Sequence, residues 1–485
     1  MTTTLAVPSR CPFHAATAIV RSPARALTRA QVPGPRGAAW ASMHWNLLTK
    51  PLPTLRDARE RYGDVFRVGM GPLPAIFFVA SPEGARQVLL ERADDYVKSR
   101  TYDGLKCFVG EGLLTNAGGE VHRERRRLAA PAFHPRRVAG LTARMAAAAA
   151  QTVDGFAGRT EIDMHAEMTQ LTLNVVGRTL FNIDLSKDEK LASAFDVAIR
   201  FAGNYAISPI RLPLSWPLPW NRRFLRARAT LDAFVDQLIA ERRAQPGDRG
   251  DLMSTFMEGT DGGTLDDVAL REEVMTMVGA GHETTAAGMA WLLSLLAEHP
   301  EIQERAREEV RRVLGDRRPE PQDLEGLEYI GRVVQEALRM RPPIWMIERT
   351  PKKDDTILGH RVPAGSTVAV SPYLLQHHPA HWEDPDRFDP DRFLPAAVAR
   401  RDRHTYLPFG AGPRVCIGAR FASLEMQLIT AMILARYRLE PTPGRAVEPE
   451  VLLTLRPRGG AHLRLTPLAA PPARSRATSA LALAA

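Results

Sequence analysis

Helical periodicity covers most of the chain and limits its fold more than any other feature. Apolar residues recur at helical spacing in the segments 119–130, 141–156, 171–180, 223–243, 265–299, 301–314 and 329–340. Segment 265–299 is the longest, and Pro300 ends it and opens the next helix at its first turn. Strand-like runs are short and lie at 65–70, 75–80, 356–358 and 367–371. The sequence therefore predicts a mainly α fold with a small β part, in the α+β class.

One large domain between two tails is the predicted organisation. The length of 485 residues would allow about three domains at roughly 150 residues each, but no repeat or composition shift marks a linker within residues 33–467. Residues 1–32 are basic and contain no acidic residue. We expect a disordered tail there, with a mitochondrial transit segment as the alternative. Residues 468–485 are rich in Ala and Pro and are expected to form a second tail.

Composition excludes several classes of protein. Hydrophobic residues make up 45% and charged residues 25%, which are ordinary values for a folded domain. The net charge of +9 comes from Arg residues spread along the whole chain rather than from a cluster, so we expect no nucleic-acid partner. Three cysteines, Cys11, Cys107 and Cys416, are too few for a disulfide framework or a zinc site, which favours a reducing compartment. The longest uncharged apolar run, 286–297, is too short for a membrane anchor, and we expect a cytoplasmic protein.

A glycine-containing loop, residues 408–418, presents the third cysteine at the start of an apolar helix predicted over 417–437. A helix N-terminus stabilises a thiolate, so Cys416 is a candidate metal ligand or nucleophile, and a buried inert thiol is the simpler alternative. A nucleophile needs a base in reach, and the loop contains no His. An axial thiolate on a haem iron needs only one cysteine. Phe409 can pack on the face of such a flat ligand, and Arg414 offers a forked donor to a carboxylate on its rim.

The loop resembles that of the cytochrome P-450 family of haem-thiolate monooxygenases, F-G-x-G-x-R-x-C-x-G. Every fixed position matches, at Phe409, Gly410, Gly412, Arg414, Cys416 and Gly418. The resemblance extends over about residues 33–467, which would form a single catalytic domain. It implies the cytochrome P-450 fold, with haem b between a long central helix and the helix after the loop. It also implies that Cys416 is the axial ligand of the haem iron.

Polar residues interrupt the longest helical segment at 280–285, Ala-Gly-His-Glu-Thr-Thr. A polar stripe facing water is one explanation. The other is a groove: Ala280 and Gly281 leave a low surface next to the cofactor, and Thr284 bonds back to a carbonyl and opens the helix. The resemblance implies that Glu283 and Thr284 are a catalytic acid–alcohol pair that delivers protons to dioxygen. His282 and Thr285 are interpreted as structural neighbours.

The pair Glu336 and Arg339 lies one helical turn apart in the segment 329–340. Its spacing alone says little, because six other Glu-x-x-Arg pairs occur in the chain. Only this pair lies in an otherwise apolar helix that is followed by Arg-Pro-Pro at 341–343. The resemblance implies a structural triad with Arg392, from the segment 388–393, in which Asp391 replaces the Glu of the family pattern. It also explains the long irregular stretch 376–414.

The two haem propionates need cationic or N–H partners. His122, where the family often has Trp, and Arg126 share one helix face. The resemblance implies Arg349 and Arg414 as further partners, with Lys106 as a weaker candidate.

The resemblance implies O2 as a substrate and an external electron source, a ferredoxin or flavodoxin-type protein with its NAD(P)H-dependent reductase. A basic cluster is the candidate docking face, and a solvated helix face is the alternative for the same residues, Arg123, Arg125, Arg127 and Arg420. We expect the chain to be a monomer.

Apolar segments are the expected walls of the substrate pocket. They are 102–114, 201–218 with Trp216, and the three residues Ile344, Trp345 and Met346. We predict a monooxygenase that hydroxylates or epoxidises a medium-to-large apolar substrate. The alternatives are a haem-thiolate isomerase or dehydratase of peroxides and a non-catalytic haem sensor, which have no need of a proton-delivering pair such as Glu283 and Thr284.

Overall fold

The computed structural model describes residues 32–70, 73–208, 211–245, 247–259, 265–315 and 317–468. The two expected tails lie outside these ranges except for Val32 and Leu468. Within the described ranges, no helix combines the length and the apolar character that a membrane span requires.

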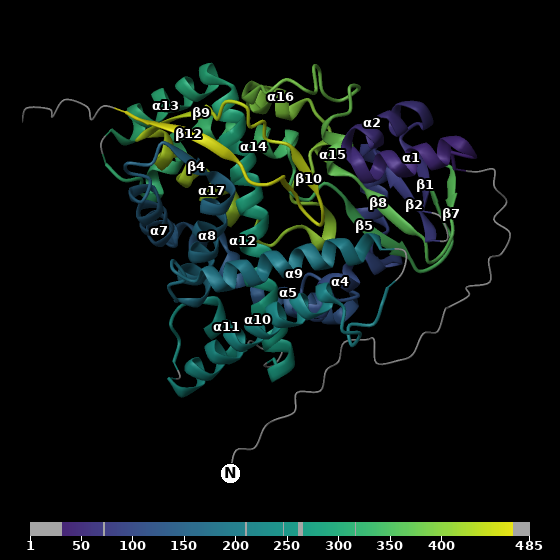
Figure 1. Cartoon of the computed structure of the whole chain (residues 1–485), viewed down its shortest axis with the longest axis horizontal. Coiled ribbons are helices and arrows are strands. Elements are labelled where there is room, and N and C mark those ends of the chain that lie inside the picture. The colour runs from purple at the N-terminus through teal and green to yellow at the C-terminus, as the bar shows by residue number, and fades with distance from the viewer. Residues whose placement is uncertain are drawn as a thin grey trace, which may run out of the picture.

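One long helix, α12 (Asp267–Glu298), runs through the middle of the molecule (Figure 1). Asp266 begins it by accepting a hydrogen bond from the backbone N–H of Ala269. Its second half is buried on all sides, which its almost continuous apolar sequence allows. It packs against α8 (Met164–Val176), α10 (Pro219–Ala244), α13 (Pro300–Leu314), α14 (Glu328–Met340) and α17 (Ala419–Leu434). The central helix predicted over 265–299 is therefore confirmed.

The other predicted helices are also present, with bounds shifted by a few residues. Segment 171–180 is the end of α8 together with a following π turn, Gly177–Phe181. The sequence analysis missed α9 (Glu189–Ile207), whose first turn is capped by Asp188. The remaining helices are α1 (Ala38–Thr49), α2 (Pro51–Tyr62), α3 (Pro82–Arg86), α4 (Asp103–Val109), α5 (Gly119–Ala129), α6 (Pro135–Gly140), α7 (Thr142–Asp154), α11 (Leu252–Glu258), α15 (Pro372–Gln376) and α16 (Pro395–Ala399).

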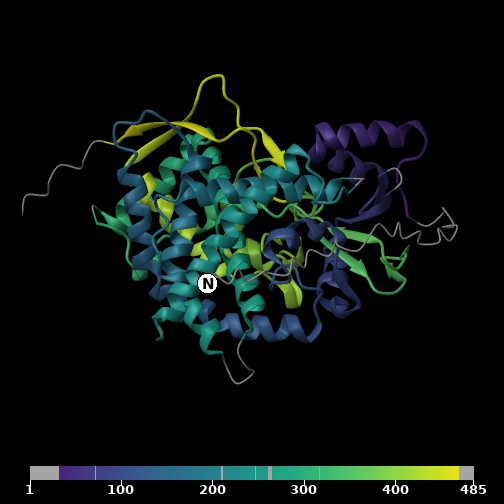
Figure 2. The same cartoon turned by 60° about the horizontal axis from the view of Figure 1, so that its bottom comes forward.

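A five-stranded sheet lies with α1 and α2 at one end of the molecule, on the right in Figures 1 and 2. Its order is β1 (Val65–Met70), β2 (Leu73–Val79), β8 (Thr367–Val370), β5 (Ile347–Pro351) and β3 (Tyr96–Lys98). The predicted hairpin is confirmed as the antiparallel pair β1 and β2. Strand β5, which the sequence analysis missed, pairs with β3 and sets Arg349 opposite Lys98. The sheet thus brings two distant cationic residues side by side.

Three smaller sheets complete the β part. Strands β6 (Asp355–Ile357) and β7 (His360–Val362) form a hairpin. Strand β12 (His462–Pro467) lies between β4 (Glu161–Asp163) and β9 (Tyr437–Pro441). Strands β10 (Pro449–Val451) and β11 (Leu455–Pro457) pair next to α12. The mainly α fold with a small β part is therefore confirmed.

Candidate functional site

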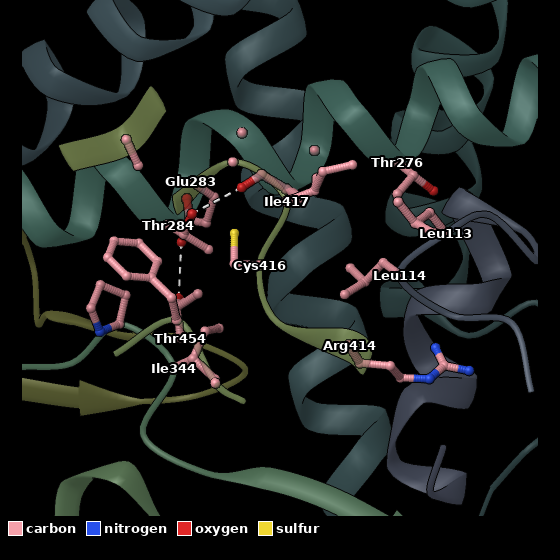
Figure 3. A pocket seen from close by; sticks show the side chains of 18 of the residues that line it. Leu113, Leu114, Thr276, Glu283, Thr284, Ile344, Arg414, Cys416, Ile417 and Thr454 are labelled. Atoms are coloured by element: carbon pink, nitrogen blue, oxygen red, sulfur yellow. Dashed lines mark hydrogen bonds between the residues drawn. The ribbon is translucent and has the colours of Figure 1, made fainter. Parts of the chain in front are cut away.

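A cavity of about 340 Å³ lies between α12 and the loop 408–418 (Figure 3). Most of the predicted site residues line it, although they come from four distant parts of the chain. They are His122, Arg126, Ala280, Gly281, Glu283, Thr284, Ile344, Met346, Arg349, Phe409, Gly410, Arg414, Cys416 and Gly418. The wall is mostly apolar, and its charged residues are Glu283 and a group at one end of the cavity.

Cys416 points into the cavity and is enclosed by its walls (Figure 3). The loop is fixed by a hydrogen bond from the Cys416 backbone N–H to the Phe409 carbonyl, at 2.9 Å. Gly412 has a φ of 71°, and a Cβ there would lie 1.8 Å from the Leu89 carbonyl oxygen, so only glycine fits. Gly418 has a negative φ and precedes α17 as its N-cap.

The predicted position of the thiol in the first helical turn is also wrong. Helix α17 begins at Ala419, so Cys416 precedes the helix. Burial raises the pKa of the Cys416 thiol, although the backbone N–H of Gly418 and the charge of Arg126 act in the opposite direction. A thiol with a raised pKa is a weak nucleophile at neutral pH, whereas a bound metal cation would remove its proton. The site therefore suits a metal-bound thiolate better than a nucleophile.

Helix α12 stays regular through the polar segment, so the predicted opening at Thr284 was wrong. The Thr284 hydroxyl does donate to the Ala280 carbonyl, at 2.9 Å, but the helical hydrogen bonding continues past it. A Cβ on Gly281 would lie 2.9 Å from a methyl of Val176, so this glycine lets α8 pack closely against α12. The water-facing stripe is excluded, because His282 and Glu283 are buried.

Two residues that the sequence analysis missed hold Glu283. Its Oε1 atom accepts a hydrogen bond from the Thr454 hydroxyl at 3.1 Å and from the Arg456 guanidinium at 3.3 Å. Both partners lie around β11, far from Glu283 in the chain. Figure 3 shows Glu283 and Thr284 on the same side of the cavity as Thr454, with the Cys416 sulfur beside them. An acid and an alcohol thus face the thiol.

A cationic group of side chains forms the opposite end of the cavity. Lys98, which was not predicted, lies there with Tyr102 from the predicted pocket wall 102–114 and with the predicted residues His122, Arg126, Arg349 and Arg414. Burial, with the neighbouring charges of Arg349 and Arg414, holds the pKa of Lys98 well below its usual value. Burial and the same kind of neighbours lower the pKa of Arg414 to about 10 and that of His122 to about 4. Glu348 is an acid at this end, but cationic and N–H groups outnumber it, which fits a ligand that carries carboxylates.

Lys106 and Trp345 are corrections to the predicted site. Lys106 does not line the cavity but pairs with Glu111 at 2.8 Å. Trp345 packs in the core beneath the sheet and donates to the Leu452 carbonyl, while its neighbours Ile344 and Met346 line the cavity. Trp216 is 51% exposed and belongs to the surface.

The predicted triad forms behind the cysteine loop. Glu336 and Arg339 are fully buried and make two hydrogen bonds of 2.6 and 2.8 Å. Arg339 also donates to the carbonyls at residues 376, 385 and 387, which fixes the irregular stretch to α14. The Arg392 Nε atom lies 3.4 Å from Glu336, as predicted. Asp391 points outward to Arg305 and Arg332, so its replacement of Glu leaves the triad intact.

The predicted basic docking cluster is only partly available. Arg125 turns away from it to Glu272 and Glu273 on α12, and its side chain is 13% exposed. Arg123 pairs with Glu120. Two of the predicted residues, Arg127 and Arg420, remain exposed.

Comparison with known proteins gives the family. The cytochrome P-450 family model matches residues 32–463. Two proteins of Streptomyces melanosporofaciens are each 36% identical to this chain. Cyclooctatin synthase matches over 87% of this chain and 92% of its own length. Cyclooctat-9-en-7-ol 5-monooxygenase matches over 82% of this chain and 87% of its own length. Pentalenene oxygenase of Streptomyces avermitilis is 34% identical, over 87% of this chain and 94% of its own length. The solved haem domain of cytochrome P-450DA superposes with a TM-score of 0.81 at 28% identity, covering 90% of this chain and 98% of that one.

The chain belongs to the cytochrome P-450 family and is a haem-thiolate monooxygenase. The residues present fit the haem that the family implies. A thiol faces a mostly apolar cavity, and the Nη1 atom of Arg414 is buried without a partner among the described residues. A carboxylate ligand such as a propionate would satisfy it.

Proposed function

We propose that the protein inserts one oxygen atom from O2 into a cyclic terpenoid or a similar medium-to-large apolar molecule. The observation that carries this proposal is the mostly apolar cavity that has Cys416 on one side and Glu283 with Thr284 on the other. The relatives named for pentalenene and for cyclooctat-9-en-7-ol support the terpenoid class.

Cys416 is proposed to be the axial ligand of haem b. When bound, haem b supplies the iron that binds and activates O2. Phe409 and Gly410 border the cavity next to the thiol, where they would exclude water from the sulfur. Ala280 and Gly281 would form the low wall on the side of α12.

The cationic end of the cavity is proposed to bind the two propionates. His122, Arg126, Arg349 and Arg414 would share their charge, and Lys98 is added to this set because it lies opposite Arg349 in the sheet. Since several donor side chains share the two carboxylates, the loss of one donor should weaken haem binding without abolishing it.

Glu283 and Thr284 are proposed to be the catalytic pair. The Thr284 hydroxyl would pass protons toward the oxygen molecule, and Glu283 would resupply it. Each turnover consumes two protons and two electrons, and one oxygen atom leaves as water. Glu336, Arg339 and Arg392 are proposed to have a structural role only.

A ferredoxin or flavodoxin-type protein with its NAD(P)H-dependent reductase is the proposed electron source. Exposed Arg127 and Arg420 lie near the cysteine loop and would attract an acidic partner. Residues 33–467 are proposed to act as one monomeric catalytic domain. The proposed location is the cytoplasm, because three cysteines are too few for a disulfide framework.

Labelled oxygen tests this proposal. The haem-loaded protein is supplied with NADPH, a ferredoxin, its reductase and ¹⁸O2, with pentalenene and cyclooctat-9-en-7-ol as the substrate probes. We expect a product of at least one probe to carry one labelled oxygen atom. Conversion of a hydroperoxide without electrons, with no labelled product from either probe, would instead support a peroxide isomerase.

A further inference from the structure

A buried arginine, Arg456 in β11, connects the acid of the cavity wall to the protein surface. Its side chain is 1% exposed, yet it contacts three carboxylates. Its Nη1 atom lies 3.3 Å from Glu283 and 3.0 Å from Asp196, and its Nε atom lies 3.0 Å from Glu450. These acids belong to α12, α9 and β10. One guanidinium therefore joins three elements around the cavity.

The three carboxylates become more exposed with distance from the cavity. The exposed fraction of the side chain is 5% for Glu283, 21% for Glu450 and 42% for Asp196. Only Glu283 lines the cavity. The two outer acids also pair with Arg200, which is 45% exposed. The ion pairs thus form a continuous path from the cavity wall to solvent.

Arg456 stays charged in this network. Burial acts to lower its pKa, but the charges of Glu283, Asp196 and Glu450 outweigh burial, and the pKa is raised above its ordinary value. Because a buried carboxyl group without a partner is unfavourable, Arg456 and Thr454 supply the charge and the hydrogen bond that hold Glu283 at the cavity wall.

Two buried nitrogen atoms beside the ion pairs have no partner among the described residues. They are Nη2 of Arg456 and Nε2 of His165, at the start of α8. His165 lies in the field of Glu283 and Arg456, and burial lowers its pKa, so its imidazole is neutral near pH 7. Buried polar atoms of this kind are satisfied by ordered water in folded proteins. Water-binding groups therefore accompany the ion pairs.

We propose that Arg456 is a positioning residue for proton delivery. It fixes the Glu283 carboxyl group at the cavity wall and, through Asp196 and Glu450, holds it beside a route to solvent. A proton from solvent passes through water bound next to these ion pairs to Glu283, and Glu283 gives it to the Thr284 hydroxyl as that hydroxyl gives its own proton to reduced oxygen; the Arg456 guanidinium keeps its protons throughout. Glu283 then takes the next proton from the same path. This inference rests on the role proposed for Glu283 and Thr284.

The test compares Arg456→Met with Arg456→Lys and with a matched control, Arg242→Met. Arg242 is also a buried arginine in an ion pair, with Asp251 at 2.6 Å, but it does not line the cavity. Oxygen consumption by the haem-loaded full chain is measured without substrate, driven by NADPH with a plant-type ferredoxin and its reductase, in H2O and in D2O.

We expect Arg456→Met to slow oxygen consumption at least about tenfold and to increase the solvent isotope effect, since a positioned proton donor typically contributes 10²–10⁴-fold. Arg456→Lys should recover at least half of the wild-type rate, and Arg242→Met should stay within about twofold of it. An unchanged rate in Arg456→Met, or an equal loss in Arg242→Met, would show that Arg456 only fastens β11 to α9.

A second measurement does not depend on turnover. The infrared spectrum of Arg456→Met should gain the C=O stretch of a protonated carboxylic acid, and the double variant Arg456→Met/Glu283→Gln should lose it. If Arg456→Met does not fold, Asp196→Asn/Glu450→Gln keeps the Arg456–Glu283 pair and should slow oxygen consumption to a similar extent.

Measurements on the wild-type protein distinguish a failure of the proposed function from a failure of the proton route alone. A wild-type protein without a thiolate-type carbon monoxide spectrum contradicts the proposed function. A normal wild-type spectrum, with oxygen consumption that Arg456→Met leaves unchanged, contradicts only the proton route.

Discussion

Replacing Arg339 by Met should destabilise the protein far more than the loss of an ordinary ion pair. Arg339 and Glu336 are both 0% exposed, so the variant leaves a buried carboxylate that has lost its two short hydrogen bonds and keeps only Arg392, at 3.4 Å, as a cation. It also removes the donor from the carbonyls at 376, 385 and 387. Breaking a buried pair in this way costs about 3–5 kcal/mol, which corresponds to about a hundredfold to a few-thousandfold shift in the folding equilibrium.

The assay is urea unfolding followed by tryptophan fluorescence, with Arg305→Met as the control. Arg305 pairs with Asp391 at 2.8 Å and is 51% exposed, so its loss should cost about 0–1 kcal/mol. We expect a large fall in the urea midpoint for Arg339→Met and a small one for Arg305→Met. The double variant Glu336→Gln/Arg339→Met should recover part of the loss, because no unpaired carboxylate remains. Equal small losses in Arg339→Met and Arg305→Met would refute the reasoning.

Three further results are expected. Gly412→Ala should fold but bind haem poorly, because the added Cβ would lie 1.8 Å from the Leu89 carbonyl oxygen and displace the cysteine loop. The haem content after reconstitution measures this effect. Full haem loading of the variant would contradict the loop geometry. Burial lowers the pKa of His282 to about 4 from 6.5, so the unfolded chain binds its proton first as the pH falls. The free energy of unfolding should therefore fall as the pH is lowered from about 6.5 to 4, by up to about 3 kcal/mol for this group. Urea midpoints measured over this interval should fall less in His282→Asn than in the wild-type protein. An equal fall in both proteins would contradict the prediction. Thr284→Val should keep consuming NADPH but release hydrogen peroxide in place of product, which a peroxide assay detects; unchanged coupling would show that Thr284 carries no proton.

Local patterns in the sequence were enough to predict the parts of the site that a single segment defines. In the loop around Cys416 the spacing of Gly, Arg and Cys residues predicts the structure, and in the long helix with Glu283 the helical recurrence of apolar residues does so. Helix α9 was missed although Asp188 supplied a capping signal, because its apolar residues were interpreted as a pocket wall.

Contacts between distant segments were predicted only where the family resemblance implied them, as for Arg392 with Glu336. Lys98 joins the cationic end only because β3 pairs with β5, and Arg456 reaches Glu283 only because β11 packs against α12. Among the three consecutive residues Ile344, Trp345 and Met346, only the outer two line the cavity, whereas Trp345 packs in the core and donates to the Leu452 carbonyl. No residue pattern showed which of them would line the cavity.

The carbon monoxide difference spectrum of the reduced, haem-loaded protein tests the central claim most directly. Coordination of the haem iron by the Cys416 thiolate predicts a strongly red-shifted Soret band in the wild-type protein and its loss in Cys416→Ser. A folded, haem-loaded wild-type protein without this band, or a Cys416→Ser variant that keeps it, would contradict the assignment of Cys416 as the haem ligand.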